Sequence, residues 1–289
     1  MKKTLLVLAL TAFAAQAQAA TWMLGETSTG GWRFGFAALT DTVGSLGTAE
    51  GRLYGFIGND SNEITTDSVT VGSWDATSAS LGVNSIDLSV NHEANVKILE
   101  NVATAGLITS VSLDNATIVD SGALNLNYWA TAPSRLTQTF IITPELGESI
   151  GGLVNINMDI WATHSLNGNL DVQGQDFVSG YDLYLNGSVI DAGSFDTLGS
   201  VGVGENWSFQ AHIGDEIRLE MRSQSQIIGG LLNVSGAPEL LGSSEAFASM
   251  TVTTVPEPET WAMLVMGLGL VSLRLRNKSK ATARNLIGA

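Results

Sequence analysis

The sequence predicts an all-β protein, a β-sandwich of jelly-roll type followed by a separate C-terminal hydrophobic helix. Three observations lead to this prediction: low charge, alternating apolar and polar segments, and glycine-containing turns between them. Only 14% of the 289 residues are charged and 32 are glycine, whereas long surface helices are rich in lysine and glutamate. Strand after strand joined by glycine turns is typical of sandwiches and barrels.

Individual strands follow from the alternation. Residues 154–161 place apolar side chains on one face and polar ones on the other, as a half-buried strand requires. Asn186-Gly187 separates two such segments and predicts a hairpin with a type I′ turn. Gly214-Asp215 predicts a second hairpin, between residues 207–213 and 216–223. Further strands are expected at residues 32–36, 53–57, 68–71, 85–90, 108–113, 136–142 and 246–255.

The strands belong to a body of residues 20–254 without a firm internal boundary. Residues 131–134 could divide it into two parts, although one sandwich of this length is also allowed. Residues 94–105 could form a short helix, but their valine, isoleucine and threonine residues favour strands, so a strand is equally plausible. The chain contains no cysteine, which excludes disulfides, a thiolate nucleophile and zinc sites with cysteine ligands.

The N-terminus has the three regions of a secretory signal peptide. Two lysines precede an apolar run, and small residues follow with Ala17 and Ala19 at alternate positions. Residues 1–19 are therefore expected to be removed after Ala19 by signal peptidase, once the general secretory machinery has engaged the chain.

The C-terminal segment, residues 255–289, has an ordered set of features. Pro256, Glu257 and Pro258 restrict the chain to a stiff, extended junction. A short apolar helix is expected at residues 260–273; its marked positions are Trp261, Ala262, Met263, Leu264, Gly267, Leu270 and Leu273. Thirteen uncharged residues, 261–273, give roughly 20 Å of helix against a hydrocarbon core of roughly 30 Å, so the helix is a marginal membrane anchor. A basic stop follows, formed by Arg274, Arg276, Lys278 and Lys280, and positive residues favour the cytoplasmic side.

This combination of Pro-Glu-Pro, Trp261-Ala262-Met263-Leu264, the glycine-leucine run and the arginines resembles the PEP-CTERM sorting signal of Gram-negative bacteria that make exopolysaccharide. The resemblance implies recognition by an exosortase, a membrane-embedded cysteine transpeptidase-like enzyme that removes the C-terminal segment. The chain would then be the substrate of that enzyme. It also implies transient anchoring in the inner membrane with the body in the periplasm, followed by transfer to the cell surface or extracellular matrix.

The charge of the body restricts its partners. Six basic residues lie between Thr21 and Val255 against 26 acidic residues, which gives this segment a net formal charge of −20. Such a body is expected to repel nucleic acid and anionic membranes.

Catalytic and metal-binding patterns are weak. His92, His164 and His212 lie far apart, have no metal-ligand spacing and are expected at exposed strand positions. The carboxylate pairs Asp159 with Glu220 and Asp182 with Glu216 have no special spacing, so a secreted glycan hydrolase remains an alternative without positive support.

Two loops cluster the oxygen ligands that calcium uses. The candidate ligands are Asp60, Asn62, Asn169, Asp171 and Asp176. Neither loop has the EF-hand pattern, and Asx turns explain both equally well.

Tryptophan offers the remaining candidate site. An indole face suits the CH-rich face of a sugar ring, and six of the seven tryptophans lie in the body. Trp74 and Trp129 lie in turn-like surroundings and are the expected ligand-stacking residues, whereas Trp161 and Trp207 are expected in the core.

The sequence thus favours a non-enzymatic exported protein, structural or adhesive, at the cell surface or in exopolysaccharide and biofilm. A carbohydrate-binding module is the alternative, and a glycan hydrolase the less favoured one. No cofactor is expected apart from the calcium considered above.

Overall fold

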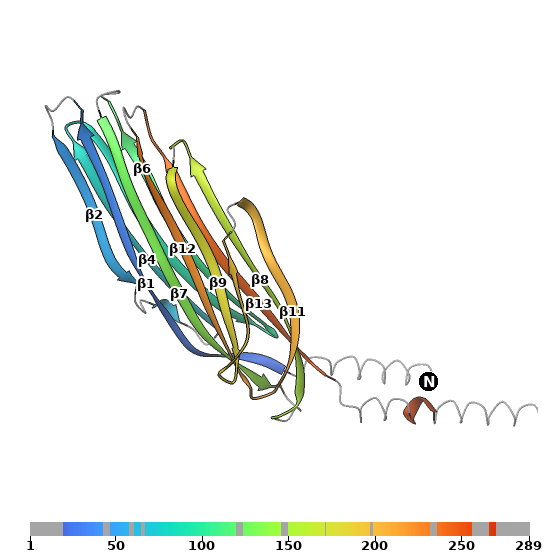
Figure 1. Ribbon diagram of the computed structural model, residues 1–289. Helices are drawn as coiled ribbons and strands as arrows, with labels where there is room; N and C mark the ends of the chain where they lie inside the picture. The colour runs from blue at the N-terminus through green and yellow to red at the C-terminus, as the bar shows by residue number, and fades with distance from the viewer. Residues whose placement is uncertain are drawn as a thin grey trace, which may run out of the picture. The chain divides into compact units, whose positions relative to one another are not determined.

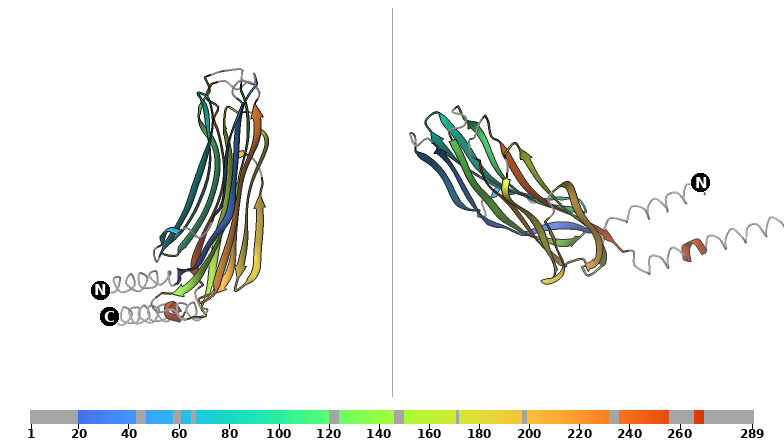
Figure 2. Two further views of the ribbon diagram at one scale, coloured as in Figure 1. Left: turned by 90° about the vertical axis from the view of Figure 1, so that its left-hand side faces the viewer. Right: turned by 45° about the horizontal axis from the view of Figure 1, so that its top comes forward.

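The computed structural model describes residues 20–42, 47–57, 61–64, 67–119, 124–145, 150–170, 172–196, 199–231, 236–255 and 266–269. The chain divides into two compact units, residues 1–253 and 254–289. In the first unit, long strands form two antiparallel sheets that face each other (Figures 1 and 2). The predicted β-sandwich is confirmed.

Both sheets are assembled from strands distant in sequence. Sheet A has the order β10 (Ser188–Phe195), β9 (Val172–Leu185), β12 (Glu216–Leu231), β7 (Leu124–Pro144), β1 (Ala20–Asp41) and β2 (Thr48–Ile57). Sheet B has the order β11 (Gly199–His212), β8 (Leu153–Gly168), β13 (Leu240–Thr254), β6 (Val102–Thr117), β5 (Asn84–Leu99), β4 (Ser68–Leu81) and β3 (Ser61–Ile64).

The last eight strands pair in a nested order. β6 pairs with β13, β7 with β12, β8 with β11 and β9 with β10, and successive pairs alternate between the sheets. The first five strands extend this arrangement, because β1 and β2 add to the β7 edge of sheet A and β5, β4 and β3 add to β6. Residues 131–134 lie inside β7, which pairs with β1 and β12.

The Asn186-Gly187 hairpin is confirmed, since β9 and β10 pair around residues with φ of 49° and 81°. The second predicted hairpin is wrong. β11 lies in sheet B and β12 in sheet A, so the Gly214-Asp215 turn carries the chain between sheets. Residues 94–105 are strand, in β5 and β6, apart from a turn at residues 100–101.

A polar layer crosses the interior between two apolar clusters. One cluster includes Phe140, Tyr181 and Leu219, and the other includes Leu88 and Phe177. Between the two clusters, strands of both sheets place buried polar side chains in the interior. These residues are His92, Thr109, Ser134, His164, Ser179, Ser223, Ser225 and Ser244.

Hydrogen bonds within this polar layer join the sheets. The Thr109 hydroxyl lies 3.0 Å from the hydroxyls of both Ser223 and Ser225. Ser179 and Ser244 lie 2.9 Å apart, and His164 Nε2 lies 3.2 Å from the Ser179 hydroxyl. Directional bonds fix which strand faces which across the sandwich, whereas apolar contacts alone are non-directional.

Two inward glycines of β1 and β2 lie where the backbone of the opposite sheet or larger side chains already fill the space. A Cβ on Gly51 would lie 2.5 Å from the Ser78 carbonyl oxygen, and one on Gly35 would lie 2.7 Å from Leu53 and Leu88 side-chain atoms. Glycine thus occupies inward positions of β1 and β2, and the aromatic residues Trp32, Phe34, Phe36, Tyr54 and Phe56 of these strands point outward.

In the second unit the structure describes residues 266–269, which are helical and include Gly267. The remainder of the predicted helix at 260–273 lies outside the described residues. Within the described parts of the chain, no helix has the length and apolar character needed to cross a membrane.

Candidate binding face

Six aromatic residues form a continuous surface on the outer side of sheet A, which we call the aromatic face. Its members are Trp32, Phe34, Phe36, Tyr54, Phe56 and Trp129. Trp32 is opposite Phe56 in the β1–β2 register, and Phe34 is opposite Tyr54. The Phe34 and Trp129 ring centroids are 4.9 Å apart, and those of Tyr54 and Phe56 are 5.5 Å apart. Tyr54 and Phe56 are strongly exposed.

A groove lies beside this face and runs across the strands of sheet A. It has a volume of about 690 Å³, and its main lining residues are Trp32, Pro133, Arg135, Gly180, Arg222 and Gln224. Trp32 belongs to both surfaces, so the groove continues the aromatic face. A Cβ on Gly180 of β9 would lie 2.9 Å from the Gly193 carbonyl oxygen and 3.5 Å from the Arg222 guanidinium, so a larger residue would not fit here without a shift of the backbone.

The arginines of the groove belong to a cross-strand quartet of charges. Arg135 and Arg222 are opposite each other in the β7–β12 register, and Glu220 is opposite Asp182 in the β12–β9 register. Arg135 is paired with Glu220, and Arg222 lies 3.4 Å from Asp182. Arg218 also contacts Glu220, at 3.5 Å, and lies over the Tyr184 ring. These opposite-charge contacts offset the repulsion between Arg135 and Arg222 and that between Glu220 and Asp182.

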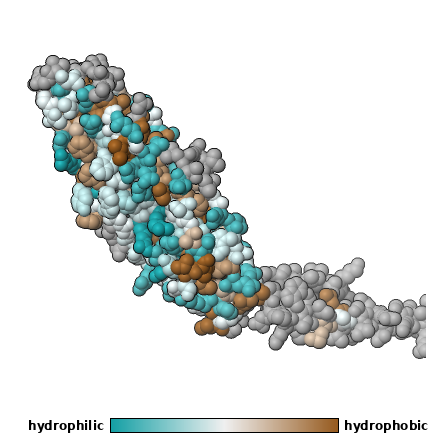
Figure 3. Space-filling model, in the orientation of Figure 1, coloured by the Kyte–Doolittle hydropathy of each residue, from teal (hydrophilic) through white to brown (hydrophobic). Residues whose placement is uncertain are grey.

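The outer face of sheet B has a different composition. It has cross-strand contacts between hydroxyls, amides and carboxylates, for example Ser89 with Ser112, Thr70 with Asn95, and Asn206 with Asp159. Figure 3 shows the side of the body that faces the viewer in Figure 1, where hydrophobic residues form separate brown patches among hydrophilic ones.

The two predicted stacking tryptophans lie on opposite faces. Trp129 belongs to the aromatic face and is 43% exposed, whereas Trp74 points outward from sheet B and is 67% exposed. They therefore cannot contact the same sugar ring. Trp207 packs partly buried against the core, as expected, but Trp161 lies on the outer side of sheet B, stacked on Phe247 and 37% exposed. The expectation that Trp161 is a core residue is wrong, because its position in the β8 pleat faces outward.

The histidines were expected at exposed positions, and two of them are buried. His164 contacts Ser179 in the polar layer. His92 has no hydrogen-bond partner for either ring nitrogen, and burial together with the positive charge of Arg33 lowers the pKa of His92 to about 4. His212 is exposed and lies 3.6 Å from Asp215.

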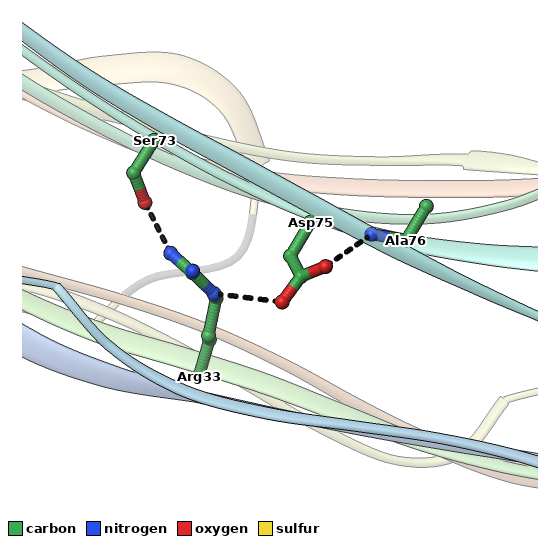
Figure 4. A network of polar contacts seen from close by, with 4 residues as sticks. All are labelled: Arg33, Ser73, Asp75 and Ala76. Atoms are coloured by element: carbon green, nitrogen blue, oxygen red, sulfur yellow. Dashed lines mark hydrogen bonds and ion pairs between the residues drawn. The ribbon is translucent and has the colours of Figure 1, made fainter.

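Arg33 reaches from β1 to the opposite sheet. Its Nε donates to Asp75 at 3.3 Å, its Nη1 donates to Ser73, and Asp75 in turn accepts from the Ala76 N–H (Figure 4). Arg33 is therefore not part of the outer face, unlike Arg52, Arg135, Arg218 and Arg222.

In neither of the two carboxylate pairs considered for glycan hydrolysis do the two residues lie opposite each other on one face. Asp159 points outward from sheet B and Glu220 outward from sheet A, so this pair cannot flank one groove. In the second pair, Asp182 is opposite Glu220 in the β9–β12 register, so Glu216, four residues before Glu220 in β12, does not face Asp182.

Two other carboxylates meet at one hydroxyl. The Tyr181 hydroxyl lies 2.6 Å from Asp191 and 2.8 Å from Glu205, which links β9, β10 and β11. Burial and these two acceptors raise the pKa of Tyr181 above its ordinary value.

The described calcium candidates already have protein partners. The Asn169 side chain donates to the Ala237 carbonyl and accepts from the Glu239 N–H, and Asp176 accepts from Gln224. The side chains of Asp60, Asn62 and Asp171 lie outside the described residues. Among described side chains, no group of three or more histidine, aspartate or glutamate residues is placed to hold a metal ion.

The predicted sorting residues and the signal peptide, with Ala17 and Ala19, lie outside the described residues except for Gly267. Residues 254–279 match the family model of the PEP-CTERM protein-sorting motif. The chain thus carries a PEP-CTERM sorting motif in its C-terminal region. The motif implies an exported protein that is transiently anchored in the membrane, processed by an exosortase and released at the cell surface.

No curated protein matches the chain. Among solved structures, a chain of broad bean stain virus has 10% identity and a TM-score of 0.21, with 50% of this chain and 98% of that chain covered. Tailspike protein 4 of bacteriophage CBA120 has 10% identity and a TM-score of 0.19, with 54% and 19% covered. Infectious bursal disease virus, Gt strain, has 10% identity and a TM-score of 0.18, with 84% and 82% covered. Similarity at these TM-scores supports no argument about fold or function.

Proposed function

We propose that the exported body is a non-enzymatic adhesive protein of the cell surface or extracellular matrix, which binds polysaccharide through the aromatic face of sheet A. The observation that carries this proposal is the continuity of that face: six aromatic side chains lie together on the solvent side of one sheet. Exposed apolar patches of this kind mark interaction sites on soluble proteins.

Polysaccharide is the partner whose chemistry fits this surface best. The CH-rich face of a pyranose ring stacks on an indole or phenyl ring, and neighbouring polar groups bind the hydroxyls. Three adjacent strands present the aromatic rings, so several consecutive sugars of one chain can be contacted. The sorting motif supports the same partner, because it sends the body to the compartment where exopolysaccharide accumulates.

A non-enzymatic role fits the distribution of carboxylates better than glycan hydrolysis does. A hydrolase needs two carboxyl groups on either side of one glycosidic bond. In the charge quartet beside the groove, Glu220 and Asp182 are instead engaged by arginines. Asp191 and Glu205, which do lie close together, are both engaged by the Tyr181 hydroxyl.

We also infer that β6 to β13 form a jelly roll, which β1 to β5 extend. The nested pairing of these eight strands supports this inference. All strands of both sheets lie within residues 20–254, so we expect a protein of residues 20–255 to fold without the C-terminal segment.

Two measurements test the proposed function. The first is the intact mass and C-terminal peptide of the native protein in membrane and matrix fractions. We expect a matrix form that ends between Pro256 and Thr260, and finding only a membrane form that retains residues 261–289 would contradict sorting.

The second measurement is co-sedimentation of residues 20–255 with the host's own polysaccharide, combined with an assay for released sugar. Retention without sugar release supports adhesion. Sugar release would establish a hydrolase, and absence of retention would overturn polysaccharide binding.

A further inference from the structure

The charged side chains that line the groove beside the aromatic face are positive. The two arginines of the charge quartet, Arg135 and Arg222, line it, whereas Glu220 and Asp182 are not among its lining residues. The side chains of both arginines are 55% exposed. A guanidinium has five N–H groups, and the structure uses only part of this capacity for the carboxylate partners. Unused donors are therefore available at the groove.

The position of these arginines is unusual within the body. Only six basic residues lie between Thr21 and Val255, against 26 acidic ones. Two of the six occupy directly opposite positions on neighbouring strands, a placement that is unfavourable for like charges. Their pairing with Glu220 and Asp182 leaves the positive ends of two ion pairs at the same groove.

We propose that this groove binds a carboxylate-bearing sugar, a uronic acid residue of an extracellular polysaccharide. Trp32 stacks on the pyranose ring, and Arg135 and Arg222 bind its carboxylate. This inference rests on the proposed adhesion to polysaccharide and specifies its ligand. The planar guanidinium fork matches a carboxylate in two parallel hydrogen bonds, and such charge-assisted bonds are stronger than bonds to a neutral hydroxyl.

The acidic character of the remaining body does not oppose this assignment at physiological salt. The Debye length is about 8 Å at 0.15 M ionic strength, so distant carboxylates are largely screened. Glu220 and Asp182 lie closer than this distance, but each contacts its arginine from outside the lining of the groove, and the charged residues that line the groove are Arg135 and Arg222.

The test uses residues 20–255 and two matched probes, trigalacturonate and its methyl ester, in titration calorimetry at 0.15 M salt. The ester keeps the sugar rings and removes the negative charge. We expect the acid to bind at least tenfold more tightly than the ester. Arg222→Gln should abolish that difference and Arg222→Lys should restore it only in part. Lys97→Gln, on the outer face of sheet B, should leave the difference unchanged.

Equal binding of acid and ester to the unmodified protein would overturn the carboxylate assignment, as would an Arg222→Gln protein that keeps the full preference. Thermal unfolding of each variant identifies any loss of fold, and Arg222→Gln removes the partner of the partly exposed Asp182 rather than of the buried Glu220. If the host polysaccharide is retained while neither probe binds, the uronate inference fails and the proposed adhesion stands. If the polysaccharide itself is not retained, the proposed function fails.

Discussion

The two outer faces of the sandwich share one construction and differ in chemistry. Both come from long antiparallel strands whose inward residues fill the same interior. Sheet A presents six clustered aromatic residues and four of the body's six basic residues. Sheet B presents hydroxyl and amide contacts such as Ser89 with Ser112, together with Trp74 and the stacked pair Trp161 and Phe247. The inward-facing residues of each strand thus specify the fold, and the outward-facing residues are free to form a binding surface.

The orientation of aromatic residues also differs between two regions of sheet A. Where β1 and β2 approach β4, the inward positions include Gly35 and Gly51, and the aromatic residues point outward. Elsewhere in sheet A the usual orientation holds, and Phe140 and Tyr181 point inward. Whether an aromatic residue stabilises the fold or contributes to the aromatic face therefore depends on the space between the sheets.

The largest expected effect comes from exchanging an inward aromatic residue. Phe140 is fully buried and packs edge-on against Trp22, with ring centroids 6.0 Å apart. Phe140→Ala should lower the free energy of unfolding by roughly 3–5 kcal/mol, because it removes apolar contacts and leaves a cavity. Phe34→Ala, on the aromatic face, is the matched control and should cost about 1 kcal/mol or less. Urea denaturation of both variants measures this, and equal losses would refute the division between inward and outward residues.

A pH-dependent effect of the interior is next in size. The pKa of His92 is about 4 in the folded protein against 6.5 for an ordinary histidine, so the unfolded chain binds the proton more readily. Stability should therefore fall as the pH decreases from 6.5 to 4, by up to about 3 kcal/mol from this residue. His92→Gln should remove that part of the pH dependence. Urea denaturation across this range measures the difference, and an unchanged slope in the variant would contradict the assignment.

Much of the strand content could be predicted from the sequence, since period-two alternation reports which residues share a face. The Asn186-Gly187 turn was also predictable, because its chemistry specifies local geometry. The Gly214-Asp215 turn was not: a glycine turn allows a hairpin and a crossing between sheets alike, and the nested pairing of distant strands decides between them.

The candidate site was only partly predictable. Trp129 was identified, but its partners Trp32, Phe34 and Phe36 were assigned only to a strand. Their alternation with Arg33 and Gly35 was a signal, although alternation alone cannot tell which set points outward. That depends on the space between the sheets. The pairing of Arg135 with Arg222 depends on the register of strands about ninety residues apart, which no local pattern contains.

The most direct test of the central claim compares two exposed tryptophans on opposite faces. Trp129→Ala and Trp74→Ala are measured for equilibrium binding of residues 20–255 to the host polysaccharide. Trp129→Ala should weaken binding at least tenfold, or about 1.4 kcal/mol, because stacked aromatic residues at the centre of an interface carry much of its affinity. Trp74→Ala should bind like the unmodified protein. Equal losses in both variants, or a loss confined to Trp74→Ala, would contradict the assignment of binding to the aromatic face of sheet A.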